Sequence, residues 1–245
     1  MDFRTRALAL VGLVGLVATS GCTSSHQRKQ PDDGSSASSA SASAAAAALA
    51  ELQRQASYGE QLSFTATYRA QGSNPARSGT VTVFHSPVAT RIDVGESGAN
   101  VRILVTDKGT FSCKFAGTNK TPLCVTLAGP GGTVPPSVDP GLQHLFTSAL
   151  DEITNGSGLR VEAAPPQTPP GGADPASCYA ITAAPSSGDL VPGTYCYLNG
   201  VLVSAEFRSS SLRMTKMEGA PKPSDFALPA PPAPLASASP STTRS

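Results

Sequence analysis

Side chains that could act as catalytic bases are few in this sequence and do not surround a nucleophile. The histidines are His26, His85 and His144. A hydrolase needs a nucleophile beside a base that is held in place, whereas His26 lies in a Ser-rich stretch and His85 ends an apolar run at a Ser-Pro turn. The paired carboxylates Asp151 and Glu152 would point apart on a helix. We therefore expect no catalytic residue, no metal site and no cofactor.

The cysteines carry a clearer chemical signal. Apart from Cys22 near the N-terminus, the chain contains Cys113, Cys124, Cys178 and Cys196. An even number of cysteines in an exported domain indicates disulfides, and four cysteines allow three connectivities. We favour Cys113–Cys124 and Cys178–Cys196, because each pair flanks a single turn region. A four-thiolate metal site is the alternative, but it lacks the usual Cys-x-x-Cys spacing.

The first of these pairings raises a question about side-chain facing. In an alternating strand, Cys113 shares a face with Phe111, whereas Cys124 faces away from its neighbours Leu123 and Val125. Joining Cys113 to Cys124 then sets two apolar runs on opposite faces. A β-bulge or a different pairing would resolve the conflict.

The N-terminus resembles the signal of bacterial lipoproteins. Arg4 and Arg6 precede an uncharged apolar run at 7–19, which is too short to span a membrane as a helix. The sequence Ala-Thr-Ser-Gly-Cys at 18–22 resembles a lipobox, except that Thr19 replaces the usual Leu, Val or Ile. The resemblance implies cleavage before Cys22 and lipid (palmitate) on its sulfur, which would anchor the protein to the outer face of the cytoplasmic membrane. Thr19 leaves ordinary secretion or a retained anchor as alternatives.

Composition indicates one folded domain. The chain has 245 residues, a formal net charge of +1 and 14% charged residues, so it lacks the basic surface that nucleic-acid binding requires. We expect a signal peptide at 1–21, a Ser/Ala-rich tether at 22–45, a domain at 46–229 and a disordered Pro/Ala/Ser tail at 230–245. A Pro/Gly-rich loop is expected at 164–175.

Alternating residues, together with runs of β-branched or aromatic residues, predict about eleven strands. The clearest case is 62–70, where apolar and polar residues alternate over nine positions. Asn199-Gly200 between two apolar runs predicts a hairpin. The remaining strands are expected at 80–84, 91–94, 101–106, 111–115, 123–127, 159–162, 178–182, 194–198, 201–207 and 212–217.

Two segments favour helix. The Ala- and Leu-rich residues 45–56 predict a short helix that buries Leu49 and Leu52. Residues 140–154 follow a helical period, after an Asp139 cap and Pro140. Their apolar stripe consists of Leu142, Leu145, Phe146, Ala149 and Ile153. The order predicts an α+β fold dominated by β-structure, in which one large antiparallel sheet curls and carries one or two helices on one face.

The order of these features resembles the LolA/LprG-like group of envelope lipid-binding proteins. The resemblance lies in the helix leading into 62–68, the runs 91–94 and 101–109, the 199–200 hairpin and the closing Ser-Asp-Phe-Ala-Leu-Pro at 224–229. It implies a half-barrel, with helices on the concave side of a curved sheet and an apolar cavity for acyl chains. The residues expected to line that cavity are Phe64, Tyr68, Val83, Ile92, Ile103, Phe111, Leu145, Phe146, Val203 and Phe207.

Two functional hypotheses follow. In the first, the lipoprotein binds a lipid or glycolipid for carriage or presentation in the cell envelope. In the second, it is a non-enzymatic sensor or interaction module that binds a partner protein there. A filled core with an exposed apolar surface would favour the second hypothesis.

Overall fold

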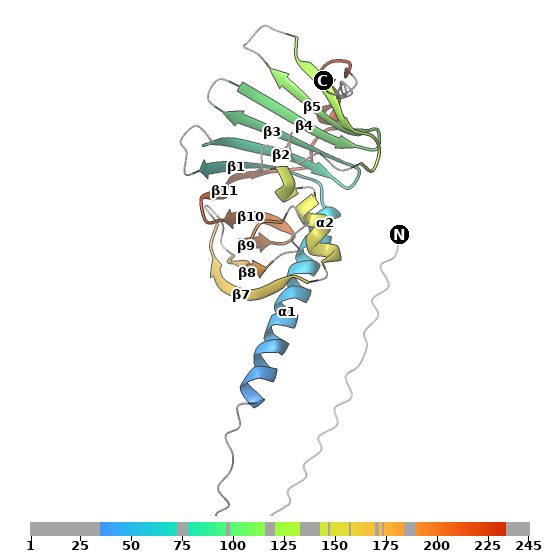
Figure 1. Ribbon diagram of the computed structural model, residues 1–245. Helices are drawn as coiled ribbons and strands as arrows, with labels where there is room; N and C mark the ends of the chain where they lie inside the picture. The colour runs from blue at the N-terminus through green and yellow to red at the C-terminus, as the bar shows by residue number, and fades with distance from the viewer. Residues whose placement is uncertain are drawn as a thin grey trace, which may run out of the picture.

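The protein forms one open antiparallel sheet with helices on one face (Figure 1). The computed structural model describes residues 35–72, 78–96, 99–115, 121–132, 143–146, 148–156, 158–169, 172, 174–183 and 190–233. The signal, Cys22 and most of the predicted tether and tail lie outside these residues, as do Asp139, Pro140 and Leu142. Among the described residues, none of the helices has the length and apolar character needed to cross a membrane.

The sheet has 11 strands in the order β6-β5-β4-β3-β2-β1-β11-β10-β9-β8-β7. The strands are β1 (Phe64–Gly72), β2 (Gly79–Ser86), β3 (Ala89–Glu96), β4 (Ala99–Thr106), β5 (Gly109–Phe115), β6 (Leu123–Ala128), β7 (Arg160–Gln167), β8 (Ala176–Ala183), β9 (Gly193–Leu198), β10 (Val201–Glu206) and β11 (Ser210–Glu218). These strands confirm the predicted fold class, and β6 and β7 form the two free edges.

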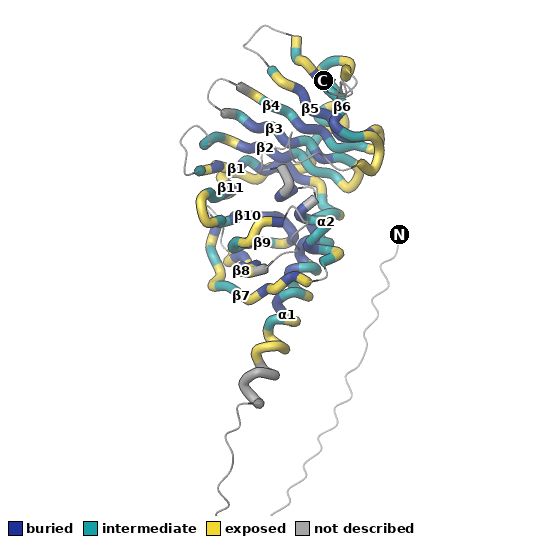
Figure 2. Tube along the Cα trace, viewed as in Figure 1, coloured by how far each residue is buried: buried dark blue, intermediate teal, exposed yellow. Residues whose placement is uncertain are grey.

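Two meanders, β1–β6 and β7–β11, become one sheet through the antiparallel pairing of β1 with β11. Tyr68 of β1 strengthens this junction, since its buried hydroxyl donates to the main-chain oxygen of Leu202 on β10 at 2.9 Å. Burial raises the pKa of Tyr68, so this hydroxyl stays protonated and remains a donor. Figure 2 shows buried residues running through both halves of the sheet.

The first helix is longer than predicted. Helix α1 runs over Ser35–Glu60, so it begins inside the segment expected to be a tether. Ala48, Leu52 and Ala56 recur at helical spacing and are buried, and the helix packs chiefly against β7. The small alanines let the helix axis approach the sheet closely. Leu49 packs at the margin of the same core.

The second predicted helix is divided in two. A 3₁₀ turn, η3 (Gln143–Phe146), precedes α2 (Ser148–Asn155). The predicted stripe is confirmed where it is described, because Leu145, Phe146, Ala149 and Ile153 are all buried in the main core. These side chains occupy the space between the two halves of the sheet.

The cysteines form the two favoured disulfides, Cys113–Cys124 and Cys178–Cys196. Cys113 lies opposite Cys124 in the β5–β6 ladder, and a bulge falls at Thr110 and Phe111. The facing question is resolved because this part of the sheet is buried on both faces. An outer cluster of Leu104, Phe111, Cys113 and Cys124 is covered by Phe115, Leu228 and Ala230, while Val125 and Leu127 pack into the main core on the inner face.

The predicted loop at 164–175 begins later than expected, because β7 continues through Pro165 and Pro166 to Gln167. Proline has no N–H to donate, so it is tolerated on an edge strand such as β7 and not in the middle of a sheet. The ladder with β8 is irregular between Ala164 and Gln167.

The Asn-Gly hairpin joins β9 to β10 as predicted and also receives the end of α1. Asn199 and Gly200 have φ of 50° and 83°, as a two-residue hairpin turn requires. The Gly200 N–H donates to the side-chain oxygen of Gln55 at 2.8 Å. A Cβ on Gly59 would lie 2.2 Å from the Gly200 oxygen, so only glycine fits there.

We expect Gly59→Ala to lower the free energy of unfolding by about 1–3 kcal/mol, the usual cost of overpacking. The steric conflict is with main-chain atoms, which a rotamer change does not relieve. Urea denaturation measures the effect. Gly129→Ala is the matched control, since a Cβ there meets no atom within 4 Å, and its effect should stay within about 0.5 kcal/mol. Equal stability of the two variants would contradict the close contact between α1 and the hairpin.

Candidate functional site

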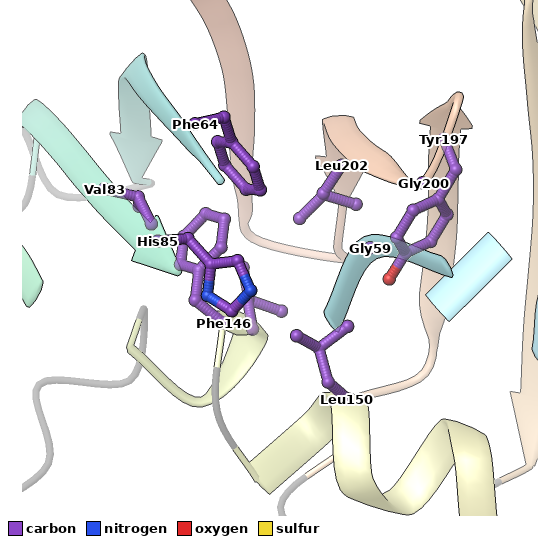
Figure 3. Close-up of a pocket in the computed structure, with 10 residues that line it drawn as sticks. Gly59, Phe64, Val83, His85, Phe146, Leu150, Tyr197, Gly200 and Leu202 are labelled. Atoms are coloured by element: carbon purple, nitrogen blue, oxygen red, sulfur yellow. The ribbon is translucent and has the colours of Figure 1, made fainter. Parts of the chain in front are cut away.

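An apolar pocket lies on the inner face of the sheet, between its two halves (Figure 3). Strands β1 and β2 contribute Phe64, Val83 and His85, while η3 and α2 close it with apolar side chains. The full lining is Gly59, Phe64, Val83, His85, Leu145, Phe146, Leu150, Tyr197, Gly200 and Leu202. The pocket therefore draws on both meanders and on all the helical segments next to them.

Side chains fill this inner pocket almost completely. The remaining cavity is about 20 Å³, room for roughly one water molecule. Phe146 packs against Tyr68 with ring centroids 5.1 Å apart. In Figure 3, Phe146 and Leu150 point from the helical segments toward the sheet residues. An acyl chain does not fit unless η3 and α2 move.

Nine of the ten residues predicted to line a lipid cavity fall into three groups. Phe64, Val83, Leu145 and Phe146 line the inner pocket. Tyr68, Ile92, Ile103 and Val203 are buried elsewhere in the same core. Phe207 is half-buried and stacks edge-on against Tyr195, with centroids 5.6 Å apart. Lipid binding by any of them stays a prediction.

Phe111 was predicted to line the same cavity, but it lies on the opposite face of the sheet. It pairs across the ladder with Leu104, whereas its neighbour Ser112 pairs with Ile103 on the inner face. Phe111 therefore belongs to the outer cluster under the C-terminal segment. Alternation predicted two faces for this strand correctly, but it did not show which face is the inner one.

Six residues of the inner pocket were not among the predicted lining residues: Gly59, His85, Leu150, Tyr197, Gly200 and Leu202. Leu202 was missed because β10 contains a register shift next to Val203, which disturbs the alternation. Tyr197 lies in a run where Tyr195, Cys196 and Tyr197 are all buried, so burial there gives no period. No sequence signal marks Gly59.

A cleft beside the inner pocket, the side cleft, gathers titratable groups. Its volume is about 450 Å³, and Glu60, His85, Asp107 and Asp151 are among its lining residues. Burial raises the pKa of Glu60, and the charge of Asp151 adds to the effect. Burial also raises the pKa of Asp151, with a further contribution from Glu152.

His85 has two partners in this cleft. Its Nδ1 lies 3.0 Å from Thr90 Oγ1 and its Nε2 lies 3.4 Å from the Glu60 main-chain oxygen. Burial lowers the pKa of His85, although hydrogen bonds to the main chain of Glu60 and Gly59 oppose the shift. The ring thus links the end of α1 to strands β2 and β3.

A larger hollow opens on the outer side of the hairpin ends. This outer hollow, of about 790 Å³, lies between the β2–β3 and β4–β5 turns and the segment 221–228, and its exposed lining is mostly apolar. Val88 lines it and is 80% exposed. The lining residues are Ser86, Val88, Ala89, Thr106, Asp107, Lys108, Phe111, Pro221, Pro223, Phe226, Ala227 and Leu228.

An ion-pair network fixes the segment that borders the outer hollow. Asp93 is held by Arg91 and Arg102, and Arg91 also donates to the Asp225 main-chain oxygen at 2.9 Å. Burial raises the pKa of Asp93, but the hydrogen bonds and charges of the two arginines outweigh burial and hold it below its usual value. Arg91 also stacks over Phe84, 4.2 Å from the ring centroid. The turn η4 (Pro223–Phe226) is thus tied to the outer face.

Comparison with known proteins shows only distant likeness. No family model matches the sequence, and neither does any curated protein. A crystal structure of MucB has a TM-score of 0.47 at 15% identity, covering 75% of this chain and 63% of that one. A complex of Pseudomonas aeruginosa MucA and MucB has a TM-score of 0.44 at 15% identity, covering 74% and 61%. This chain thus spans less than two thirds of those chains, and likeness at this level carries no functional argument.

The lowered pKa of His85 predicts acid sensitivity. As pH falls through about 6.5, the unfolded state takes up a proton that the folded state resists, so the free energy of unfolding falls. We expect His85→Asn to remove part of this loss between pH 7.5 and 5.5, as measured by urea denaturation. The raised pKa values of Glu60 and Asp151 act in the opposite direction and are common to both proteins. Identical slopes in the two proteins would contradict the burial of His85.

Proposed function

We propose that the protein is a non-enzymatic binding module of the cell envelope that binds a partner protein through its outer face. The observation that carries this proposal is the contrast between the two faces. The inner pocket retains about 20 Å³ of space, whereas the outer hollow is open, about 790 Å³ in volume and mostly apolar. Contiguous exposed apolar surface of this kind marks interaction sites.

Two observations support an extracytoplasmic location. Disulfides form and persist in oxidising compartments outside the cytosol, and both disulfides lie within the sheet. The lipobox-like sequence at Cys22 supports a membrane anchor. We therefore propose that the module faces the extracytoplasmic space while lipid holds it at the outer face of the cytoplasmic membrane.

Lipid binding is the second candidate, favoured by the apolar ring around the inner pocket. Opening the pocket exposes Leu145 and Phe146, at a cost of about 1.5–3 kcal/mol for each side chain. An acyl chain that moves from water into the inner pocket would gain about 0.8 kcal/mol of free energy per methylene. The acyl chains of a lipid in a bilayer are already shielded from water. Their transfer into the inner pocket therefore gains little free energy, too little to offset the cost of opening the pocket. For this reason we favour partner binding over lipid binding.

A fluorescent fatty acid probe tests the lipid candidate. If η3 and α2 open for acyl chains, Phe146→Ala should bind cis-parinaric acid about tenfold more tightly than the unmodified protein, because the space is already vacated. Val88→Ala, on the exposed turn, is the matched control and should bind as the unmodified protein does. No saturable binding by any of the three proteins would remove lipid as a candidate.

Partner binding is tested by site-specific photo-crosslinking in the native cell. With benzoylphenylalanine at Val88, we expect an adduct with a single protein, and none with the same group at Met217. Met217 is a suitable control because it is 51% exposed on β11 and is not among the residues that line the outer hollow. The adduct identifies the partner for measurement with purified proteins.

The purified partner should bind Val88→Asp at least about tenfold more weakly than the unmodified protein, equivalent to about 1.4 kcal/mol. A carboxylate introduced into a mostly apolar interface loses its hydration when the partner binds. Met217→Asp should change the affinity less than about twofold. Equal loss in both variants, or in neither, would contradict binding at the outer hollow.

A further inference from the structure

The two free edges of the sheet differ in their ability to accept another strand. At one edge, β7 contains Pro165 and Pro166, which lack the N–H donors that a ladder needs. At the other edge, β6 (Leu123–Ala128) has no proline. Of the two edges, β6 therefore offers an incoming chain main-chain groups that are not broken by proline.

A segment of the same chain already occupies part of the β6 edge. We name residues 221–233 the C-terminal strap. Ala233 donates its N–H to the Cys124 oxygen at 2.9 Å and accepts from the Thr126 N–H at 3.0 Å. These bonds form a parallel bridge opposite Val125. Among the described residues, these two main-chain bonds are the ones that join this edge to another segment.

The strap covers the edge for only one residue. Main-chain groups of Cys124 and Thr126 point outward. The strap's bonds use the Cys124 oxygen and the Thr126 N–H, and not the Cys124 N–H or the Thr126 oxygen. The alternation ends there, because a bulge places Ala128 opposite Thr110 of β5. Pro232 precedes Ala233 and faces away from β6 by the same alternation. Its missing N–H prevents a further strand from adding outside the strap, which is a common protection of sheet edges.

The strap has a firm end and a weak end. Its η4 end is held by Arg91 through the Asp225 oxygen, and Leu228 and Ala230 cover the outer cluster. Beyond Ala230, all the described residues are exposed. Ala233 is thus held by its two main-chain bonds, each of which contributes a factor of about three to ten in an equilibrium constant.

We propose that the β6 edge is a strand-addition site for an extended segment of the partner protein, running parallel to β6, and that the end of the strap at Ala233 is its intramolecular occupant. The strap shows which chemistry fits: an extended chain with a small side chain opposite Val125 and a free N–H facing Cys124. A segment without proline at the alternate positions would add bonds at Cys124 and Thr126, and so would displace the strap. This proposal rests on the proposed function and names how the partner engages the same outer face.

The test uses the full exported chain and a fluorescent synthetic peptide with the sequence of residues 225–236 as the probe. Ala233→Pro removes the donor to Cys124 and should release the end of the strap. We expect this variant to bind the probe at least about tenfold more tightly than the unmodified chain. Ala233→Ser keeps both main-chain bonds at an exposed position and should bind as the unmodified chain does.

Hydrogen exchange at the Thr126 amide reports the state of the edge independently. Exchange should be faster in Ala233→Pro and slow again when the probe saturates. Faster exchange without probe binding would overturn the proposal, because the edge would be free and yet not accept a strand. Unchanged exchange would overturn it as well, since the strap would not be held at Ala233.

A dimer of Ala233→Pro in light scattering, without probe binding, would assign the edge to a second copy of this chain and would also overturn the proposal. The experiment contains no partner protein, so its failure is distinct from failure of the proposed function. If Val88→Asp weakens binding of the partner protein while Ala233→Pro leaves probe binding unchanged, the proposed function is supported and strand addition is contradicted. If the proposed function and strand addition both hold, the partner should bind Ala233→Pro more tightly than Ala233→Ser.

Discussion

The pairing of β1 with β11 is the constraint on which the rest of the structure depends. Each meander pairs only strands that are neighbours in sequence, and this single ladder joins them into one sheet. The bond from Tyr68 to the Leu202 oxygen crosses the same junction. Once the halves are joined, Gly200 meets Gly59 at the end of α1. Leu145 and Phe146 are then enclosed between the halves, which closes the inner face.

Because side chains fill the inner pocket, we assign partner binding to the outer face. There the ion pairs of Asp93 hold the C-terminal strap, and the strap covers the buried outer cluster and borders the outer hollow. The sheet is thus buried on both sides at β5 and β6, and the outer cover is a short, extended segment. Such a cover shields the edge strand while contributing few hydrogen bonds, which suits a surface that exchanges one strand for another.

Local patterns predicted much of this fold from the sequence. Alternation and runs of β-branched or aromatic residues predicted the strands, Asn199-Gly200 marked its turn, and cysteine positions gave both disulfides, because all of these are short-range signals. The β1–β11 pairing joins residues far apart in the chain and leaves no local trace. The strap was also missed, since residues 221–233 have no period and bind through main-chain atoms. Phe111 was assigned to the wrong face because alternation gives two faces without naming the inner one.

The most direct test of the account is the native mass of residues 23–245, exported and purified without detergent. A closed inner face predicts the mass of the polypeptide with both disulfides formed, unchanged after incubation with lipid vesicles. A stoichiometric lipid adduct that survives in the gas phase and is recovered by organic extraction would contradict the account. It would show that η3 and α2 open in solution and that the inner face is the binding site.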